Sequence, residues 1–312
     1  IGISDDGVLS THEDLLGKIS SNQAYYSSWH GTAVSGIAAA NTDNNIGISG
    51  IGFNSNILFS YTGMQNLLTL SQNGARVVNA SWYNSCNFNQ LDQLIIDEIY
   101  NNGTVIVVAS GNGTTCGNPD AYVYPASYNH VISVSSVGQL ETPWFSNGSA
   151  YNWRDRVEGK ISDPTSRHQT NDMVDIRVPG FAIISTVDPN SFNGSKYSST
   201  WGTSFAAPQV TGAISLMLTA NPCLNPDEVE TILKLTSVKL DSIQENLPYV
   251  NKLGAGRMDI GKATKMAWQM NPSNGGLLEI KNRNFNKWNF ILTNSPESIS
   301  ISNQSFIENS NV

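Results

Sequence analysis

The amino-acid sequence predicts an α/β fold in which a doubly wound, mostly parallel β-sheet carries helices on both faces. Short runs of β-branched and apolar residues alternate with longer stretches of amphipathic, helical spacing, which is the pattern of repeated β-α-β units. Several of the short runs are apolar throughout, as strands covered by helices on both faces must be. With 312 residues, the chain is long enough to bury a large core.

The individual elements follow from these patterns in order along the chain. Strands are expected at residues 1–4, 57–61, 76–80, 104–109, 131–135 and 174–178. Helices are expected at residues 31–40, 91–101, 203–220, 226–235 and 258–270. Asn225 is placed to cap the fourth helix, with Pro226 at its first position, and Gly103 follows the end of the second. The polar stretch 147–171 has neither periodicity and is expected to be a long surface loop.

A change of composition after Met270 predicts the domain organisation. Asn271-Pro-Ser-Asn-Gly-Gly marks a break in the chain. We expect one domain over residues 1–270 and an Asn/Ser-rich C-terminal extension over 271–312, in which short alternation near 299–301 favours the start of a β-rich appendage. Because the chain begins without Met on an apolar strand, we also expect an upstream region such as an N-terminal pro-segment to be absent from it.

Composition and charge argue against two classes of partner. The formal net charge is −8 and the pI is near 4.9, without the clustered Lys and Arg that a nucleic-acid phosphate backbone requires. The longest apolar runs have the length of a strand, whereas a membrane span needs about 20 residues. We therefore expect neither nucleic-acid binding nor a membrane-spanning segment.

The three cysteines, Cys86, Cys116 and Cys223, do not have the spacing of metal ligands. A zinc site is therefore not expected. Their odd number is compatible with one disulfide and one buried thiol, and the sequence alone does not select the pair.

Three residues have the chemistry of nucleophilic catalysis. Ser204 opens an expected helix, where free backbone N–H groups stabilise negative charge, His30 opens another, and Asp5 follows the first expected strand. Each has an ordinary explanation when taken alone: a helix N-cap serine, a buried imidazole and an Asp-Gly turn. Together, in the order Asp, His, Ser at strand ends and helix starts, they supply an orienting group, a base and a nucleophile.

The segments around these residues resemble the signature blocks of the subtilisin-like serine proteases: Ile3-Ser-Asp5-Asp-Gly-Val, His30-Gly-Thr-Ala-Val-Ser-Gly and Gly202-Thr-Ser204-Phe-Ala-Ala-Pro. The resemblance extends to about Ala263. It implies a serine endopeptidase that hydrolyses peptide bonds in proteins through an acyl-enzyme, with Asp5, His30 and Ser204 as its triad. The Asp-x-Gly pattern selects Asp5 over the neighbouring Asp6.

The resemblance also implies an oxyanion hole and a substrate cleft. Val107-Val-Ala-Ser-Gly-Asn112 is similar to the oxyanion segment of the family, so Asn112 is expected to act with the backbone N–H of Ser204; otherwise it is an ordinary turn residue. The residues expected to bind substrate are Ser81, Trp82, Tyr83, Ala109, Gly111 and Val123. Bulky Trp82 and Tyr83 are expected to narrow the primary pocket or to move its wall, and a valine at its floor is expected to make it shallow. Small or medium apolar side chains are therefore favoured before the cleaved bond. Cys86 and Cys116 lie on segments that flank this pocket in the family, which favours their pairing and a free Cys223.

The same family resemblance implies a structural calcium site. Its expected ligands are Asp14 and the loop residues Thr42, Asn44, Ile46 and Ile48, through carboxylate, amide and carbonyl oxygens. The alternative is a solvated, Asn-rich turn. Catalysis itself is expected to need no cofactor.

Several alternatives keep the fold but change the activity. A specialised processing protease or a peptide ligase on the same fold differs in its products. A non-catalytic binding relic would lack one of the four site residues, yet Asp5, His30, Asn112 and Ser204 are all present. The acid-active serine-carboxyl relatives replace the histidine, which His30 argues against. The resemblance implies a monomer, secreted or at the cell surface, that acts on protein or peptide substrates.

Overall fold

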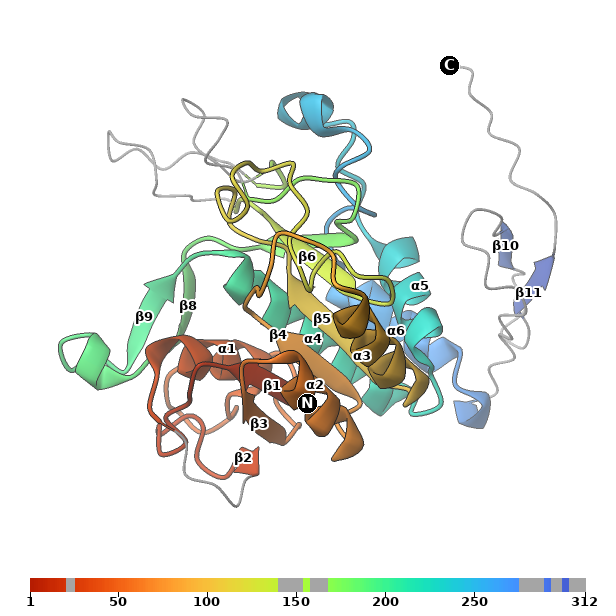
Figure 1. Cartoon of the computed structure of the whole chain (residues 1–312). Helices are drawn as coiled ribbons and strands as arrows, with labels where there is room; N and C mark the ends of the chain where they lie inside the picture. The colour runs from red at the N-terminus through yellow and green to blue at the C-terminus, as the bar shows by residue number, and fades with distance from the viewer. Residues whose placement is uncertain (21–25, 140–153, 158–167, 275–288, 293–298, 303–312) are drawn as a thin grey trace.

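The computed structural model describes residues 1–20, 26–139, 154–157, 168–274, 289–292 and 299–302. Its central feature is a seven-stranded sheet in the order β2-β3-β1-β4-β5-β6-β7, in which every neighbouring pair is parallel (Figure 1). The strands are β1 (Gly2–Asp5), β2 (Ile19–Ser20), β3 (Ile57–Tyr61), β4 (Val77–Ala80), β5 (Val105–Ala109), β6 (Ile132–Val137) and β7 (Ile176–Pro179).

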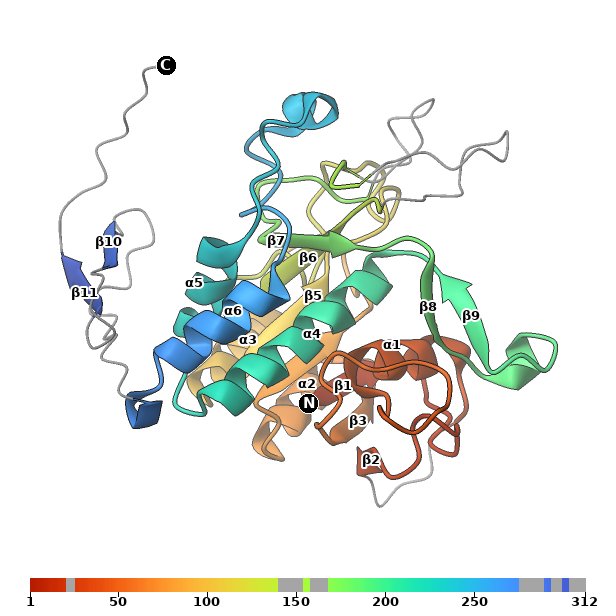
Figure 2. The same cartoon turned by 180° about the vertical axis from the view of Figure 1, so that it is seen from behind.

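Helices cover both faces of this sheet, so the predicted doubly wound α/β class is confirmed. They are α1 (Trp29–Ala39), α2 (Met64–Gln72), α3 (Gln90–Asn101), α4 (Thr203–Ala220), α5 (Pro226–Thr236) and α6 (Ile260–Gln269). α2 and α3 lie in front of the sheet in Figure 1, whereas Figure 2 shows α1, α4 and α6 on the opposite face.

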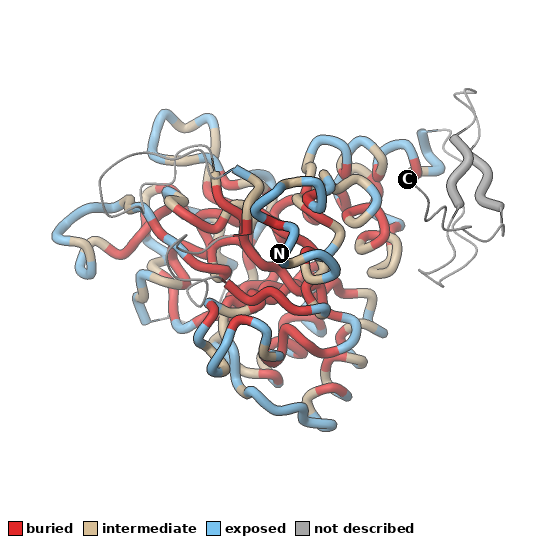
Figure 3. The backbone as a smooth tube through the Cα atoms, turned by 90° about the horizontal axis from the view of Figure 1, so that it is seen from above, coloured by how far each residue is buried: buried red, intermediate tan, exposed pale blue. Residues whose placement is uncertain are grey.

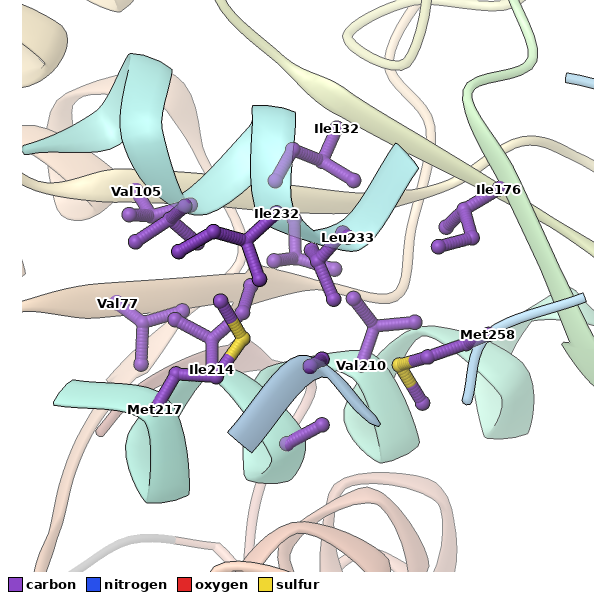
Figure 4. Close-up of a cluster of buried hydrophobic side chains, with 14 of the residues drawn as sticks. Val77, Val105, Ile132, Ile176, Val210, Ile214, Met217, Ile232, Leu233 and Met258 are labelled. Atoms are coloured by element: carbon purple, nitrogen blue, oxygen red, sulfur yellow. The ribbon is translucent and has the colours of Figure 1, made fainter. Parts of the chain in front are cut away.

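Alternate residues of the strands pack into separate hydrophobic clusters on the two faces of the sheet. Val77 and Val107 pack with α4, α5 and α6, where Ile214 and Ile232 are fully buried (Figure 4). Val78 and Ile106 face the other way and pack with α2 and α3. The buried backbone therefore runs through the middle of the molecule, with exposed loops around it (Figure 3).

The observed elements agree with most of the expected ones and add several. The helix expected at 31–40 begins at Trp29, because Ser28 caps it, and the one expected at 258–270 begins at Ile260 after the cap residue Asp259. Asn225 caps α5 in a reciprocal capping box with Glu228. The sequence patterns did not predict α2, β2 or the antiparallel hairpin of β8 (Ile183–Thr186) and β9 (Tyr197–Thr200).

Two expected segments fall largely outside the described residues. Of the expected loop 147–171, only 154–157 and 168–171 are described. In the C-terminal extension, β10 (Asn289–Leu292) and β11 (Ile299–Ser302) pair as antiparallel strands, and the domain boundary near residue 270 stays a prediction. Within the described residues, no helix has both the length and the apolar character needed to span a membrane.

Candidate active site

The predicted site residues lie at the carboxyl edge of three adjacent parallel strands. Asp5 ends β1, Ser81 directly follows β4, and Ala109 ends β5. Because parallel strands end at the same edge of the sheet, their terminal residues come together although they are far apart in sequence. The beginnings of α1 and α4 complete this edge with His30 and Ser204.

Asp5 and His30 form a direct hydrogen bond. Nδ1 of His30 lies 2.7 Å from Oδ1 of Asp5, and the side chain of His30 is 21% exposed whereas that of Asp5 is 2% exposed. The same carboxylate oxygen accepts the backbone N–H of Asp6 at 2.9 Å. With Asp5 ionised, Nδ1 is the protonated nitrogen, so neutral His30 has its lone pair on Nε2. The carboxylate of Asp6 instead accepts the backbone N–H of Gly31.

Burial and mutual interaction shift both pKa values of this pair. Burial raises the pKa of the Asp5 carboxyl to about 6, while the charge and hydrogen bond of His30 oppose that rise. Burial lowers the pKa of His30, but the charge and hydrogen bond of Asp5 outweigh it, so the net pKa is raised above its ordinary 6.5. The imidazole of this pair therefore binds a proton more tightly than an ordinary histidine does.

Ser204 lies in the first turn of α4, whose N-cap Gly202 has a φ of 128° that favours glycine. Its hydroxyl donates to the carbonyl of Ser81 at 3.2 Å, and the hydroxyl of Ser81 donates to the carbonyl of Ser204 at 2.8 Å. Among the described residues, no hydrogen bond joins Ser204 to His30. The next residue, Phe205, has its ring centroid 5.3 Å from that of His30, so the first turn of α4 lies beside the imidazole.

Asn112 follows β5 and faces the beginning of α4. Its Oδ1 accepts the backbone N–H of Thr203 at 2.9 Å and the hydroxyl of Thr203 at 3.0 Å. A backbone N–H can only donate, so the amide orientation is determined by its partner, and the NH2 group of Asn112 remains available for another acceptor.

A cavity of about 310 Å³ opens beside Ser204. It brings together all but one of the residues predicted to bind substrate and adds two that the sequence analysis missed, Thr115 and Thr203. Its lining consists of Ser81, Trp82, Tyr83, Ala109, Gly111, Asn112, Thr115, Thr203 and Ser204.

Val123, the predicted floor of the pocket, does not line the cavity. The residue is buried, and its Cγ2 lies 3.2 Å from where a Cβ on Gly111 would be. It therefore supports Gly111 from behind. The indole of Trp82 donates to the carbonyl and the hydroxyl of Ser4, both at 3.1 Å, which anchors the ring on β1, while Tyr83 is 56% exposed.

The disulfide between Cys86 and Cys116 is confirmed, with a Cα to Cα distance of 5.6 Å. It ties the segment after β4 to the loop that contains Thr115. Cys223 is free, as predicted, but its thiol is exposed and not buried as expected.

Four of the five residues expected to bind calcium are linked to one another by hydrogen bonds, whereas Thr42 contacts Ser49 instead. Asp14 is completely buried, and its two carboxylate oxygens accept the side-chain N–H of Asn44 and the backbone N–H of Ile48, both at 2.8 Å. Oδ1 of Asn44 accepts the backbone N–H of Ile46, while the hydroxyl of Thr42 pairs with that of Ser49. The oxygen donors are of the type Ca²⁺ prefers, although the Asn44 amide would have to turn its oxygen toward the ion.

Comparison with known proteins agrees with this architecture. The sequence model of the "Subtilase family" matches residues 1–259. Subtilisin DY of Bacillus licheniformis is 30% identical over 257 residues, which cover 77% of this chain and 84% of that protein. Thermitase of Thermoactinomyces vulgaris is 31% identical over 237 residues, covering 70% of this chain and 74% of that protein.

Other relatives are longer than this chain. The matched region spans 56% of a thermophilic serine proteinase from a Bacillus species that is 30% identical. Among solved structures, fervidolysin from Fervidobacterium pennivorans superposes with a TM-score of 0.66 at 23% identity, over 85% of this chain and 42% of that one. The likeness in fold and the family match over most of the sequence lead to one conclusion: the chain belongs to the subtilase family and is a serine endopeptidase.

Proposed function

We propose that Ser204 is the nucleophile of this endopeptidase, with His30 as general base and Asp5 as the group that orients it. The hydrogen bond of 2.7 Å between His30 and Asp5 is the observation that carries the proposal, because it leaves the lone pair of Nε2 as the only basic position of the neutral imidazole. The first turns of α4 and α1 bring the serine and this base to the edge of the sheet where β1 ends at Asp5.

The reaction then proceeds through an acyl-enzyme. The Ser204 hydroxyl leaves the carbonyl of Ser81 and gives its proton to Nε2 of His30 as Oγ attacks the substrate carbonyl. His30 next donates this proton to the departing amine, and water attacks the acyl-enzyme by the same sequence of proton transfers. Asp5 stays ionised and stabilises the imidazolium.

The oxyanion formed in each step is stabilised by two donors. One is the backbone N–H of Ser204, which has no partner within the first turn of α4. The other is the side-chain NH2 of Asn112, whose oxygen is held by Thr203. Both act in the partly enclosed cavity beside Ser204 and need little reorganisation as charge develops.

The segment Ser81 to Tyr83 is suited to bind the acyl side of a substrate in extended conformation. In the described part of the chain, the backbone N–H and C=O groups of Trp82 and Tyr83 have no protein hydrogen-bond partner, so they are open to a peptide strand. The cavity lined by Gly111 and Thr115 would take the side chain before the cleaved bond. With Val123 packed behind Gly111, we propose that small or medium apolar side chains fit best.

Two observations indicate where the enzyme acts. Relatives from Dichelobacter nodosus and Xanthomonas campestris are named extracellular proteases, and the Cys86 to Cys116 disulfide is the kind of bond that persists outside the cytosol. We propose that this chain also acts outside the cytosol, as a monomer, on protein or peptide substrates.

The test is casein digestion by the wild type, Ser204→Ala and His30→Ala. The change Ser242→Ala, at an exposed serine outside the proposed machinery, serves as the matched control. We expect activity to fall by a factor on the order of 10⁶ in the first two variants and to persist in the control, with covalent labelling by a serine-directed fluorophosphonate lost in Ser204→Ala. Retention of activity and labelling in Ser204→Ala would refute the proposal.

A further inference from the structure

The imidazole of His30 packs into a corner made by two aromatic side chains. Its ring centroid lies 5.5 Å from that of Trp29 and 5.3 Å from that of Phe205, and these two rings lie 6.1 Å from each other. All three distances are within the range of favourable contacts between aromatic rings. Phe205 is 2% exposed and Trp29 is 37% exposed, so one wall of the corner belongs to the core and the other to the surface.

The hydrogen bond to Asp5 fixes only one atom of the imidazole. His30 must accept a proton from Ser204 and then donate it to the leaving amine, which requires Nε2 to keep its position while the ring changes charge. A ring held at Nδ1 alone can swing about that bond, and the 21% exposure of the His30 side chain leaves room toward solvent. Contact with two rings that themselves touch removes much of this freedom.

Trp29 is in turn supported by the β8–β9 hairpin, which lies beside α1 in Figures 1 and 2. The ring of Phe192, in the turn of the hairpin, packs edge-on against Trp29 with centroids 5.6 Å apart. Two residues before Trp29, the hydroxyl of Ser27 donates to the carboxylate of Asp188 at 2.5 Å. The hairpin therefore contacts Trp29 itself through the ring of Phe192, and it contacts Ser27, two residues earlier, through a hydrogen bond to a carboxylate.

The hairpin is also anchored on α1 just after His30. The hydroxyl of Thr186 donates to the carbonyl of Thr32 at 2.8 Å, and that of Ser185 donates to the carbonyl of Ala33 at 2.7 Å. These bonds are buried, so the hairpin and the first turns of α1 form one packed unit. Phe192 therefore reaches Trp29 from a firm base.

We propose that Trp29 is a positioning residue, which holds the His30 imidazole in the orientation needed for both proton transfers and is itself held by Phe192. Trp29 would not touch the reacting atoms; it acts through His30. The inference rests on the proposed role of His30 as the general base.

The test compares Trp29→Ala and Trp29→Phe in the full chain, with Trp268→Ala as a matched control, since Trp268 is a 54% exposed tryptophan on α6. A small displacement of a catalytic group can reduce the rate by up to about 100-fold. For Trp29→Ala we therefore expect kcat to fall about tenfold or more with KM within about twofold, and Trp29→Phe to recover most of the loss. Phe192→Ala should give a smaller loss of the same kind.

A spectroscopic readout separates positioning from a general loss of structure. In wild-type protein, the proton shared by Nδ1 of His30 and Asp5 should give a low-field NMR signal, and that signal should broaden or disappear in Trp29→Ala but persist in Trp268→Ala. Unchanged kcat and an unchanged signal in Trp29→Ala would overturn the inference, and so would equal losses in Trp29→Phe and Trp29→Ala. Failure of the proposed function is distinct, because activity would then survive in His30→Ala.

Discussion

Asn112 and Thr203 are joined by two hydrogen bonds to a single oxygen. Oδ1 of Asn112 accepts both the backbone N–H and the hydroxyl of Thr203, and the same hydroxyl accepts the backbone N–H of Gly111 at 3.1 Å. The end of β5 and the beginning of α4 are therefore locked together at the point where the proposed oxyanion donors lie. The amide of Asn112 is oriented before any substrate arrives.

We expect Asn112→Ala to lower kcat by about 10²- to 10³-fold with little change in KM, which is the loss that removal of such a donor causes in subtilisin. The donor acts on charge that exists only in the transition state. Steady-state kinetics on a peptide substrate measure this. Asn112→Asp is the control of equal size, and it should be no better than Asn112→Ala because a carboxylate cannot donate. Near-wild-type kcat in Asn112→Asp would contradict the assignment.

The rate should depend on the protonation of His30. Its raised pKa predicts that kcat/KM increases with pH and reaches half its maximum above pH 6.5, because only the neutral imidazole can act as base. Asp5→Asn removes the charge and hydrogen bond that raise this pKa, so its half-maximum should move to lower pH. Its plateau should fall by a factor on the order of 10⁴. A pH–rate profile of both proteins measures these effects, and a shift of the Asp5→Asn midpoint to higher pH would contradict them.

Calcium should stabilise the fold through the loop around Asp14. Asp14 is completely buried and offers carboxylate oxygens of the type Ca²⁺ prefers, and ligand binding to the native state raises the melting temperature. We expect Ca²⁺ to raise the Tm of the wild type in a thermal shift assay and a chelator to lower it. Asp14→Asn should abolish the difference, whereas Asp43→Asn, in the same loop but outside the proposed ligands, should keep it. Equal Tm values with and without Ca²⁺ in the wild type would exclude the site.

The disulfide closes a loop with a sequence separation of 30 residues. Its loss in Cys86→Ser plus Cys116→Ser should lower the free energy of unfolding by about 3 to 4 kcal/mol, because the unfolded chain gains the entropy of the opened loop. Urea unfolding measures this, with Cys223→Ser as the control that should change little. Thiol titration of the denatured wild type should find one free thiol before reduction and three after it.

The cavity beside Ser204 should select the residue before the cleaved bond. Because Val123 fills the space behind Gly111, we expect a peptide library to be cleaved fastest after small or medium apolar residues. Val123→Gly should extend the preference to larger side chains, while Val131→Ala, a buried valine elsewhere in the core, should leave the preference unchanged. Fastest cleavage by the wild type after Phe or Tyr would contradict the prediction.

The sequence predicted the sheet well because its strands are apolar on both faces, as Val105 to Ala109 shows. The sequence did not predict α2. Its apolar residues Leu67, Leu68 and Leu70 occupy a short stretch beside polar residues, so the helical spacing is not apparent. The short hairpin β8–β9 was missed because its strands combine buried and exposed polar residues, such as Ser185 and Ser199, without a clear alternation. Whether such a segment forms a strand depends on its packing against the rest of the protein.

Within the site, the order of Asp5, His30 and Ser204 and the resemblance of their segments to the family identified them as candidates, and the resemblance alone added Asn112. Thr115 enters the cavity because a disulfide and a loop bring it there, and no local pattern signals that. The partner of the Trp82 indole, Ser4, is its neighbour only across β1 and β4. The position of this ring against β1 could therefore not be predicted from the sequence, because the contact exists only once β1 and β4 lie side by side.

The pairing of Ser81 with Ser204 joins residues 123 positions apart, and β1, at the very beginning of the chain, supplies Asp5 to the same edge. During synthesis, the early strands and α1 emerge long before α4 exists. If Ser204 is the nucleophile, as we propose, the growing polypeptide is expected to have no activity until α4 packs against the sheet and brings Ser204 to Asp5 and His30.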